Sequence, residues 1–348
     1  MISFESDYIT GAHPVILEKL YNTNLEQQSG YGNDKYTKSA KKKIKSACGL
    51  PTAEVELLVG GTQTNATIIS TMLKDYEGVV SAITGHVNTH EAGAIEFTGH
   101  KVLTIENHDG KITVADLKKF LDKFYNDRNA SHMVYPGMVY ISHPTEYGTI
   151  YKKTELKEIY KICRKYDMTL FIDGARLGYG LMCDESDMTL KDIAKFSDVF
   201  YIGGTKVGAL CGEAVVFAKN NKPHNFMPSI KRRGALLAKG RLLGVQFDTL
   251  FSNNLYFDIS KHAVDMANEL KKMLKRHGYK FFINSPTNQQ FIIIDKKEAL
   301  KLRKEVAFSV WEEYDKNNLI IRLATTWSTT KDDINKLETI INNIKNKK

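Results

Sequence analysis

The chain has 348 residues, of which 42% are hydrophobic and 26% charged, with only 7 prolines and 24 glycines. This composition supports a large folded core and excludes wholesale disorder, fibrous repeats and a small disulfide-stapled scaffold. The formal net charge of +9 requires nucleic-acid binding to be considered. However, the basic residues are spread thinly, and clusters such as Lys231–Arg233 lack interleaved aromatic residues. We expect a solvated basic surface and no nucleic-acid partner.

The sequence also bears on the cellular compartment. It contains no apolar run long enough to span a membrane, and its first residues, with Glu5 and Asp7, lack the apolar core of a signal peptide. The cysteines lie far apart and form no C-x-x-C pair: Cys48, Cys163, Cys183 and Cys211. We therefore expect a cytoplasmic protein with reduced thiols, no membrane partner and no bound metal.

In chain order, strand-like and helix-like segments alternate up to about residue 218. Val55–Val59 is an apolar strand pattern, Gly60–Thr62 interrupts it, and Thr64–Leu73 has a helical composition. A strand at Met138–Ile141 precedes a helix whose expected cap is Thr154. Further segments follow as strand, helix, strand and strand, at 169–172, 187–196, 199–202 and 213–218.

This alternation predicts an α/β fold with a mainly parallel sheet covered by helices on both faces. Ligands bind such sheets beyond the carboxyl ends of the strands. Gly61, Asp173 and Lys206 each follow a predicted strand, so we expect them to meet at one edge of the sheet.

From about residue 225 the pattern changes. We expect a basic helical stretch over 229–250 and a long helix near 257–276. Short strands (279–284, 291–295 and 319–324) then alternate with helices near 299–315 and 331–345. The predicted division is a large domain with an N-terminal arm over 1–228, and connecting helices with a small α+β domain over 229–348.

Lys206 and Asp173 are the first candidates for chemistry. Lys206 lies in a glycine-rich turn between apolar segments, where desolvation would lower its pKa and make it a nucleophile for an aldehyde cofactor. Asp173 could pair with a protonated pyridine nitrogen and so keep a cofactor ring electron-withdrawing. The plain alternatives are a solvated lysine, and a carboxylate that caps a loop or pairs with Arg176.

An anion site is expected where Gly60–Asn65 opens a helix. Glycines allow a ligand to approach the backbone, and the N–H groups and dipole of a helix start favour a phosphate. The hydroxyl of Thr205 could contact the same phosphate. The alternative is a plain glycine turn in which Thr62 or Thr64 caps the helix.

Histidines and arginines supply the remaining candidates. His86 could stack on a cofactor ring, and His90 or His132 could accept a proton, because imidazole titrates near neutral pH. Ordinary core or surface histidines remain the alternative, and no third metal ligand is suitably spaced. Arg322 lies in an apolar strand, where an internal salt bridge or a substrate carboxylate would have to pair with it.

These segments occur together, in order, over nearly the whole chain: Ser6-Asp7, Tyr31–Asp34, Gly60–Asn65, His86–Gly93, Asp173–Leu177 and Thr205-Lys206. The set resembles the threonine aldolase and β-eliminating lyase family of pyridoxal-phosphate enzymes, which have the aspartate-aminotransferase-like fold (fold type I). The resemblance therefore implies a fold-type-I large domain with a small C-terminal domain, and pyridoxal 5′-phosphate as the cofactor.

The resemblance also implies residue roles. Lys206 would carry the cofactor, Asp173 would pair with its ring nitrogen, and His86 would stack on the ring. The other implied roles are phosphate binding by Gly61 and Thr62 (with Thr205), cofactor and substrate-carboxylate binding by Arg176, carboxylate binding by Arg322 near Ser6, and a second active-site histidine, His132.

Such enzymes form their sites at a dimer interface, usually within a homotetramer. Tyr31, and one basic residue among Arg233, Lys239 and Arg241, would then reach the site of a neighbouring subunit.

Two segments depart from the family pattern. Ser142–Glu146 stands where better-known members carry Glu-Asn-Thr-His, and Thr205–Val207 stands where they carry Ser-Lys-Gly. The first departure puts substrate choice in doubt.

The expected activity is cleavage of the Cα–Cβ bond of a β-hydroxy amino acid, with L-threonine or L-allo-threonine giving glycine and acetaldehyde. The proton acceptor for the hydroxyl is left open among His90, His132 and a water. The alternative within enzymes is another pyridoxal-phosphate lyase acting by β-elimination, or an aminotransferase. Rivals from other classes are a non-catalytic basic binding protein and a metal-dependent aldolase.

Overall fold

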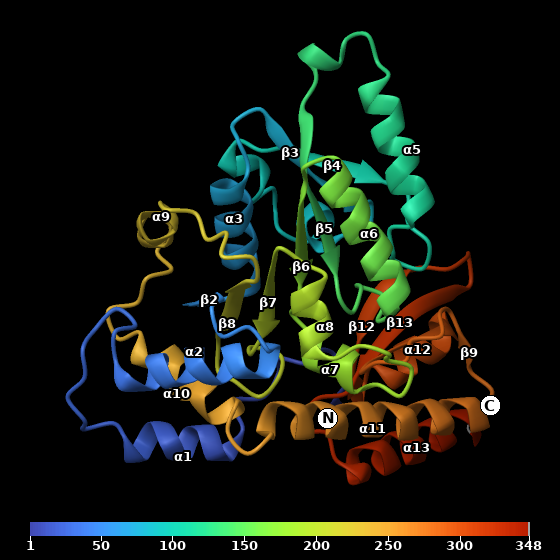
Figure 1. The fold of residues 1–348 in the computed structure, drawn as a ribbon. Helices are drawn as coiled ribbons and strands as arrows, with labels where there is room; N and C mark the ends of the chain where they lie inside the picture. Colours follow the sequence, from blue (N-terminus) through green and yellow to red (C-terminus); the bar gives the residue numbers. More distant parts are fainter. Residues whose placement is uncertain (347–348) are drawn as a thin grey trace.

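The computed structural model describes residues 1–346, which form a large sheet covered by helices and a smaller C-terminal sheet (Figure 1). The large sheet has seven strands, and only β8 runs antiparallel to its neighbours. In spatial order the strands are β2 (Glu54–Leu58), β8 (Glu213–Phe217), β7 (Val199–Gly203), β6 (Thr169–Asp173), β5 (Tyr135–Ser142), β3 (Glu77–Ala82) and β4 (Val102–Ile105). The predicted α/β class is confirmed.

Helices cover both faces of this sheet because side chains alternate along each buried strand. In β5, Val139 and Ile141 point into one hydrophobic cluster while Met138 and Tyr140 point into the other. The first cluster is closed by α1 (Pro14–Asn22), α2 (Lys35–Cys48), α5 (Val114–Tyr125), α6 (Lys153–Lys165), α7 (Leu177–Met182), α8 (Leu190–Lys195) and α10 (Arg241–Leu250). The second is closed by α3 (Gly61–Met72) and α9 (Phe226–Arg232).

The C-terminal part is built on a four-stranded antiparallel sheet with a hydrophobic cluster of its own. Its elements are β9 (Lys280–Phe281), β10 (Gln289–Asp295), β12 (Ser309–Glu313) and β13 (Asn318–Ala324), with helices α11 (Leu255–Arg276), α12 (Lys296–Leu302) and α13 (Lys331–Asn346). The N-terminal strand β1 (Ile2–Ser3) pairs with β11 (Val306–Ala307), so the start of the chain is fixed against this part.

Three expectations about local structure are wrong. The helix expected near 299–315 ends at Leu302, and β11 and β12 follow, because Val306–Glu313 pairs with β1 and β13. The basic stretch 229–250 divides into α9 and α10. Thr154 does not cap α6, because the helix begins at Lys153 and its N-cap residue is Lys152. The Lys152 backbone N–H donates to the Glu155 carboxylate (2.7 Å) at this end of the helix.

The domain boundary expected at residue 228 falls inside α9, and α10 packs against α1 and α2 of the large part. The position of the domain boundary therefore stays a proposal.

Among the described residues, no helix combines the length and the apolar character needed to cross a bilayer.

Candidate active site

A cavity of about 310 Å³ opens at the carboxyl edge of the large sheet. Its walls come from the start of α3 after β2, the loop after β5, the end of β6, the turn after β7 and the start of β8. The N-terminal arm adds Tyr8, and the segment after β3 adds His86 and Glu91. Because β8 is antiparallel, its first residue, Glu213, lies at the same edge as the ends of the parallel strands. The predicted convergence of Gly61, Asp173 and Lys206 is thus observed, since all three line this cavity.

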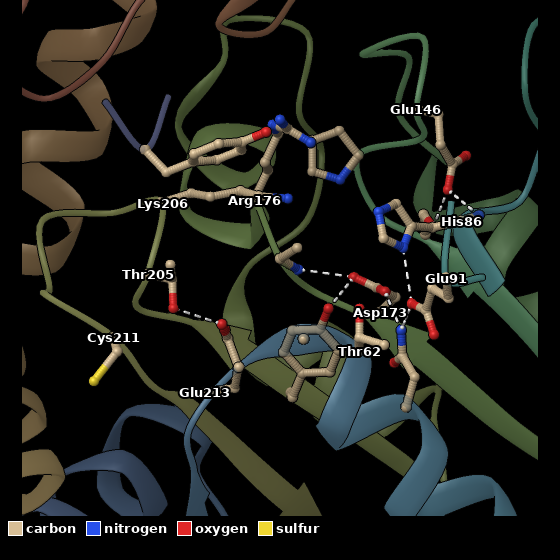
Figure 2. Close-up of a pocket in the computed structure, with 18 of the residues that line it drawn as sticks. Thr62, His86, Glu91, Glu146, Asp173, Arg176, Thr205, Lys206, Cys211 and Glu213 are labelled. Carbon is tan, nitrogen blue, oxygen red and sulfur yellow. Dashed lines mark hydrogen bonds and ion pairs between the residues drawn. The ribbon is translucent and has the colours of Figure 1, made fainter. Parts of the chain in front are cut away.

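Asp173 lies at the centre of the site, where β6 ends (Figure 2). Its carboxylate is held by four donors: Asn65 Nδ2 (3.1 Å), Tyr140 Oη (2.6 Å), Tyr201 Oη and the Ala175 backbone N–H (3.0 Å). Burial alone would raise the pKa of Asp173, but nearby His86 and these hydrogen bonds outweigh it and lower the pKa. The carboxylate therefore stays ionised inside the protein, and Arg176 is not its partner.

Lys206 follows β7 in a turn closed by backbone bonds from Gly204 and Thr205 N–H to the Gly212 carbonyl. The Tyr179 hydroxyl also donates to the Lys206 carbonyl (2.5 Å), which fixes the backbone from which the amine extends. Burial lowers the pKa of Lys206, and the charge of Arg176 lowers it further. An amine with a lowered pKa is a better nucleophile at neutral pH.

The start of α3 forms an open anion cradle. Its N-cap residue is Gly60, which has no side chain to bond the first N–H groups, so neither Thr62 nor Thr64 caps the helix. A Cβ on Gly60 would point into open space, and the buried Thr64 Oγ1 has no partner among the described residues. These free donors favour a phosphate.

Thr205 lines the same cavity, but its hydroxyl donates to Glu213 Oε1 (2.8 Å) and accepts from the Gly212 N–H (3.0 Å). In this arrangement its proton is therefore not directed at a phosphate. Burial raises the pKa of Glu213 to about 8, although the bond from Thr205 opposes the shift.

His86, in the short helix α4 (His86–Thr89), bonds through Nδ1 to Glu91 Oε1 (2.8 Å). Burial alone would lower the pKa of His86, but Glu91 and Asp173 raise it. His90 stacks on His86 (ring centroids 5.7 Å apart) and on Trp311 (6.2 Å). His90 does not line the first cavity but lines a second cavity beside it.

The second cavity has a volume of about 410 Å³ and shares Tyr8, His86, Glu146, Arg176 and Lys206 with the first. Its other walls are mostly aromatic or polar: Thr84, Thr89, His90, Tyr147, Ser309, Val310, Trp311 and Arg322. The site thus has two joined chambers, with Lys206 reaching both.

The two arginines face these chambers. Arg176 makes a two-pronged ion pair with buried Asp7, through Nε (2.6 Å) and Nη2 (2.9 Å). Arg322 has no carboxylate partner among the described residues. It donates to Gln289 Oε1 (3.0 Å), the Glu5 carbonyl (3.1 Å) and Ser309 Oγ (3.1 Å), and lies 5.3 Å from the Trp311 ring centroid.

Burial lowers the pKa of Arg322 to about 10, and the charge of Arg176 adds to the effect. Arg176 is paired with Asp7, whereas Arg322 forms no ion pair among the described residues, and this excess of positive charge favours a bound anion. The internal salt bridge considered for Arg322 is therefore not formed, and a ligand carboxylate is the partner that fits.

The structure does not bring three of the predicted residues into these cavities. Ser6 is buried beside Asp7 with an unpartnered hydroxyl, and the arm instead contributes Tyr8. His132 is exposed in a 3₁₀ turn before β5, at the opposite end of that strand. Tyr31 is half exposed beside Lys231, whose Nζ lies 4.9 Å from its ring centroid.

The basic residues proposed to reach a second subunit, Arg233, Lys239 and Arg241, line neither cavity. Arg241 bonds the carbonyls of Thr23 and Glu26, and Lys239 is exposed. Gln63 Nε2 donates to the Arg233 carbonyl (2.9 Å), so the loop after α9 lies against the start of α3.

Sequence reasoning assigned no individual role to several site residues, although Asp7, Asn65, Glu91 and Glu146 lie in segments that it had singled out. Asn65, Tyr140 and Tyr201 hold Asp173, Asp7 holds Arg176, and Glu91, Glu146 and Glu213 line the first cavity. A signal existed for Tyr140 and Tyr201, because each polar ring stands in an apolar strand and its hydroxyl needs a buried partner.

The comparisons with known proteins agree with this geometry. The β-eliminating lyase family model matches residues 3–298. A low-specificity L-threonine aldolase from a Pseudomonas species is 30% identical over 280 residues, covering 78% of each chain. A solved threonine aldolase of Leishmania major is 39% identical, covers 99% of each chain and has a TM-score of 0.94.

A Thermus thermophilus aspartate aminotransferase shares the fold alone, at 13% identity and a TM-score of 0.69 over 99% of this chain and 91% of that one. The expected aspartate-aminotransferase-like fold is thereby confirmed. With the family model spanning most of its length, the chain belongs to the β-eliminating lyase family.

Proposed function

We propose that this protein is a pyridoxal 5′-phosphate-dependent lyase that cleaves the Cα–Cβ bond of a β-hydroxy amino acid, with L-threonine or L-allo-threonine giving glycine and acetaldehyde. The observation that carries the proposal is the pairing of an amine of lowered pKa, Lys206, with an ionised buried carboxylate, Asp173, in one cavity. The likeness to solved and curated threonine aldolases supports the choice of substrate.

The residues of the first cavity fit this cofactor. Free N–H groups at Gly61 and Thr62 suit its phosphate, and Asp173 suits its ring nitrogen. Lys206 would carry it covalently, and the flat ring of His86 would lie against it. When bound, such a cofactor withdraws the electrons of a bond broken at Cα.

The chain's own residues would do the rest. Arg322 and Arg176, in the second cavity, would hold the substrate carboxylate and so orient the bond to be broken. Aromatic walls from Tyr147 and Trp311 would exclude water around the departing aldehyde. Glu91 would fix the His86 ring through its Nδ1.

The test is an assay of aldehyde, ammonia and keto acid released from a panel of amino acids. We expect aldehyde from L-threonine or L-allo-threonine, and no turnover by Lys206→Ala. Ammonia with a keto acid instead would indicate β-elimination, the reaction named by the family model. A keto acid that requires an acceptor would indicate transamination. Wild-type turnover by Lys206→Ala would overturn the role of this lysine.

We further propose a homo-oligomer in the cytoplasm. Large apolar side chains remain exposed on and around α1, including Val15, Leu17 and Tyr21 (83% exposed), and such patches favour association. All four cysteines are unpaired, which suits a reducing compartment. Light scattering of the purified protein tests the first point, since a monomer at micromolar concentration would contradict it.

A further inference from the structure

Glu146 occupies the boundary between the two cavities. It lies in the loop after β5 and lines both chambers, as do Lys206, Arg176 and His86. It is part of Ser142–Glu146, one of the two segments in which this chain departs from the family it resembles. None of the roles assigned above uses this carboxylate.

One oxygen of Glu146 is fixed and the other is free. Oε1 accepts hydrogen bonds from the His86 backbone N–H (2.8 Å) and from Ser142 Oγ (2.6 Å). Oε2 makes no hydrogen bond to another residue within residues 1–346, and the half-buried Glu146 lines both cavities. Figure 2 shows the carboxylate above His86, with only one oxygen joined by dashed lines. The side chain is therefore held in place while Oε2 can meet a ligand.

We propose that Glu146 Oε2 is the base that accepts the β-hydroxyl proton of the substrate. This role rests on the proposed function. The O–H bond breaks and its proton passes to Oε2, while its electron pair forms the aldehyde C=O bond. The Cα–Cβ bond breaks, and its electrons remain with the glycine part of the substrate. A proton is later delivered to Cα, so glycine and the aldehyde together contain every atom of the substrate.

The surroundings of Glu146 suit this task. Burial raises the pKa of Glu146, and the charge of Asp173 raises it further. The bonds from Ser142 and the His86 N–H lower the pKa and so oppose this rise. A base whose pKa is closer to the working pH accepts a proton more readily. The titratable or charged groups around it are His86, Tyr140, Tyr147, Tyr151, Asp173, Arg176 and Lys206.

The histidines are less well placed. His90 lines only the second cavity, is exposed to solvent, and already bonds Thr89 Oγ1 through Nδ1 (2.6 Å). His132 lies at the far end of β5. Glu146 is the carboxylate that both chambers share.

The experiment compares two reactions of the cofactor-loaded enzyme. Glu146→Gln keeps an oxygen for the Ser142 and His86 bonds but cannot accept a proton. Threonine cleavage needs the hydroxyl proton removed, whereas exchange of the glycine Cα hydrogen with deuterated water does not. We expect kcat for cleavage to fall by about 100-fold or more, with glycine exchange and glycine binding, read from the visible spectrum, within about three-fold of wild type.

Two further variants guard against indirect effects. Glu146→Asp keeps a carboxylate on a shorter side chain and should recover part of the cleavage lost in Glu146→Gln. Glu158→Gln, on the exposed face of α6, makes the same chemical change far from the cavities and should behave as wild type.

Two results would overturn the assignment. Cleavage at the wild-type rate by Glu146→Gln would show that another group takes the proton. A parallel loss of glycine binding and exchange would show that Glu146 only maintains the site. A wild-type enzyme that exchanges glycine but cleaves no β-hydroxy amino acid would instead overturn the proposed function, and the role of Glu146 with it.

Discussion

Two carboxylates of the site differ in the direction of their pKa shifts. Asp173, which lines the first chamber, accepts four hydrogen bonds and has a lowered pKa. Glu146, which lines both chambers, accepts bonds from Ser142 and the His86 N–H on one oxygen and has a raised pKa. Burial raises the pKa in both cases, so the donors and charges nearby decide the direction of the shift. One carboxylate is suited to holding a fixed charge and the other to exchanging a proton.

Glu213 extends this comparison within the first chamber. It accepts one side-chain bond, from Thr205, and its Oε2 has no partner among the described residues. Burial raises its pKa to about 8. The pKa of Glu213 thus moves in the same direction as that of Glu146, and at about 8 it leaves the Glu213 carboxyl mostly protonated at neutral pH.

The largest effect should come from removing the fixed charge. Asp173→Asn keeps the size of the side chain but would leave the ring nitrogen of the proposed cofactor without an ion-pair partner. We expect kcat/KM for threonine cleavage to fall by about 100-fold or more. Tyr140→Phe removes only one donor to Asp173 and should cost about five-fold. Equal activity of Asp173→Asn and wild type would contradict the contrast between Asp173 and Glu146.

The next largest effect should be on stability, and it should come from the Asp7–Arg176 ion pair. Asp7→Asn leaves Arg176 as an unpaired buried charge, so we expect the free energy of unfolding to fall by about 3 kcal/mol in urea titrations. As a control, Asp184→Asn changes an exposed side chain and should have little effect.

The same pair predicts a pH dependence of stability. Burial would raise the pKa of Asp7, but Arg176 and Lys206 lower it to about 2. A carboxylate with a depressed pKa stabilises the fold above its unfolded pKa, and this contribution is lost as the pH falls from about 4 to about 2. This loss of stability should be absent in Asp7→Asn. If the free energy of unfolding falls equally in both proteins between about pH 4 and about pH 2, the lowered pKa of Asp7 is contradicted.

The smallest effect at neutral pH should come from Glu213→Gln, since glutamine resembles the protonated carboxyl. Near pH 7 we expect less than about a two-fold change in cofactor affinity of the cofactor-free protein. Above pH 8 the wild-type carboxyl ionises near the phosphate cradle, so wild-type affinity should fall while that of the variant does not. Fluorescence titration at pH 7 and pH 9 measures both, and parallel pH curves would refute the raised pKa.

The sequence predicted the parts of the site that depend on strand ends. Gly61, Asp173 and Lys206 follow apolar strands, and parallel topology brings those ends together. The sequence did not predict the partners of the site residues. Asp7 pairs with Arg176, and Tyr140 donates to Asp173. Each contact joins segments far apart in the chain, which periodicity does not reveal.

The fold was predicted less well where tertiary pairing overrides local preference. Residues 303–313 were expected to be helical, yet β11 and β12 form because β1 and β13 supply their partners. His132 was expected in the site as a possible proton acceptor and from the family resemblance, and the structure puts it at the other end of β5.

The central claim is that Lys206 carries the cofactor covalently in the first chamber. The most direct measurement is borohydride reduction of the purified, cofactor-loaded protein, followed by mass spectrometry of its peptides. We predict the mass of reduced pyridoxal phosphate on the peptide containing Lys206, and no labelling of Lys206→Ala. Unlabelled protein, or labelling confined to a different lysine, would contradict the account.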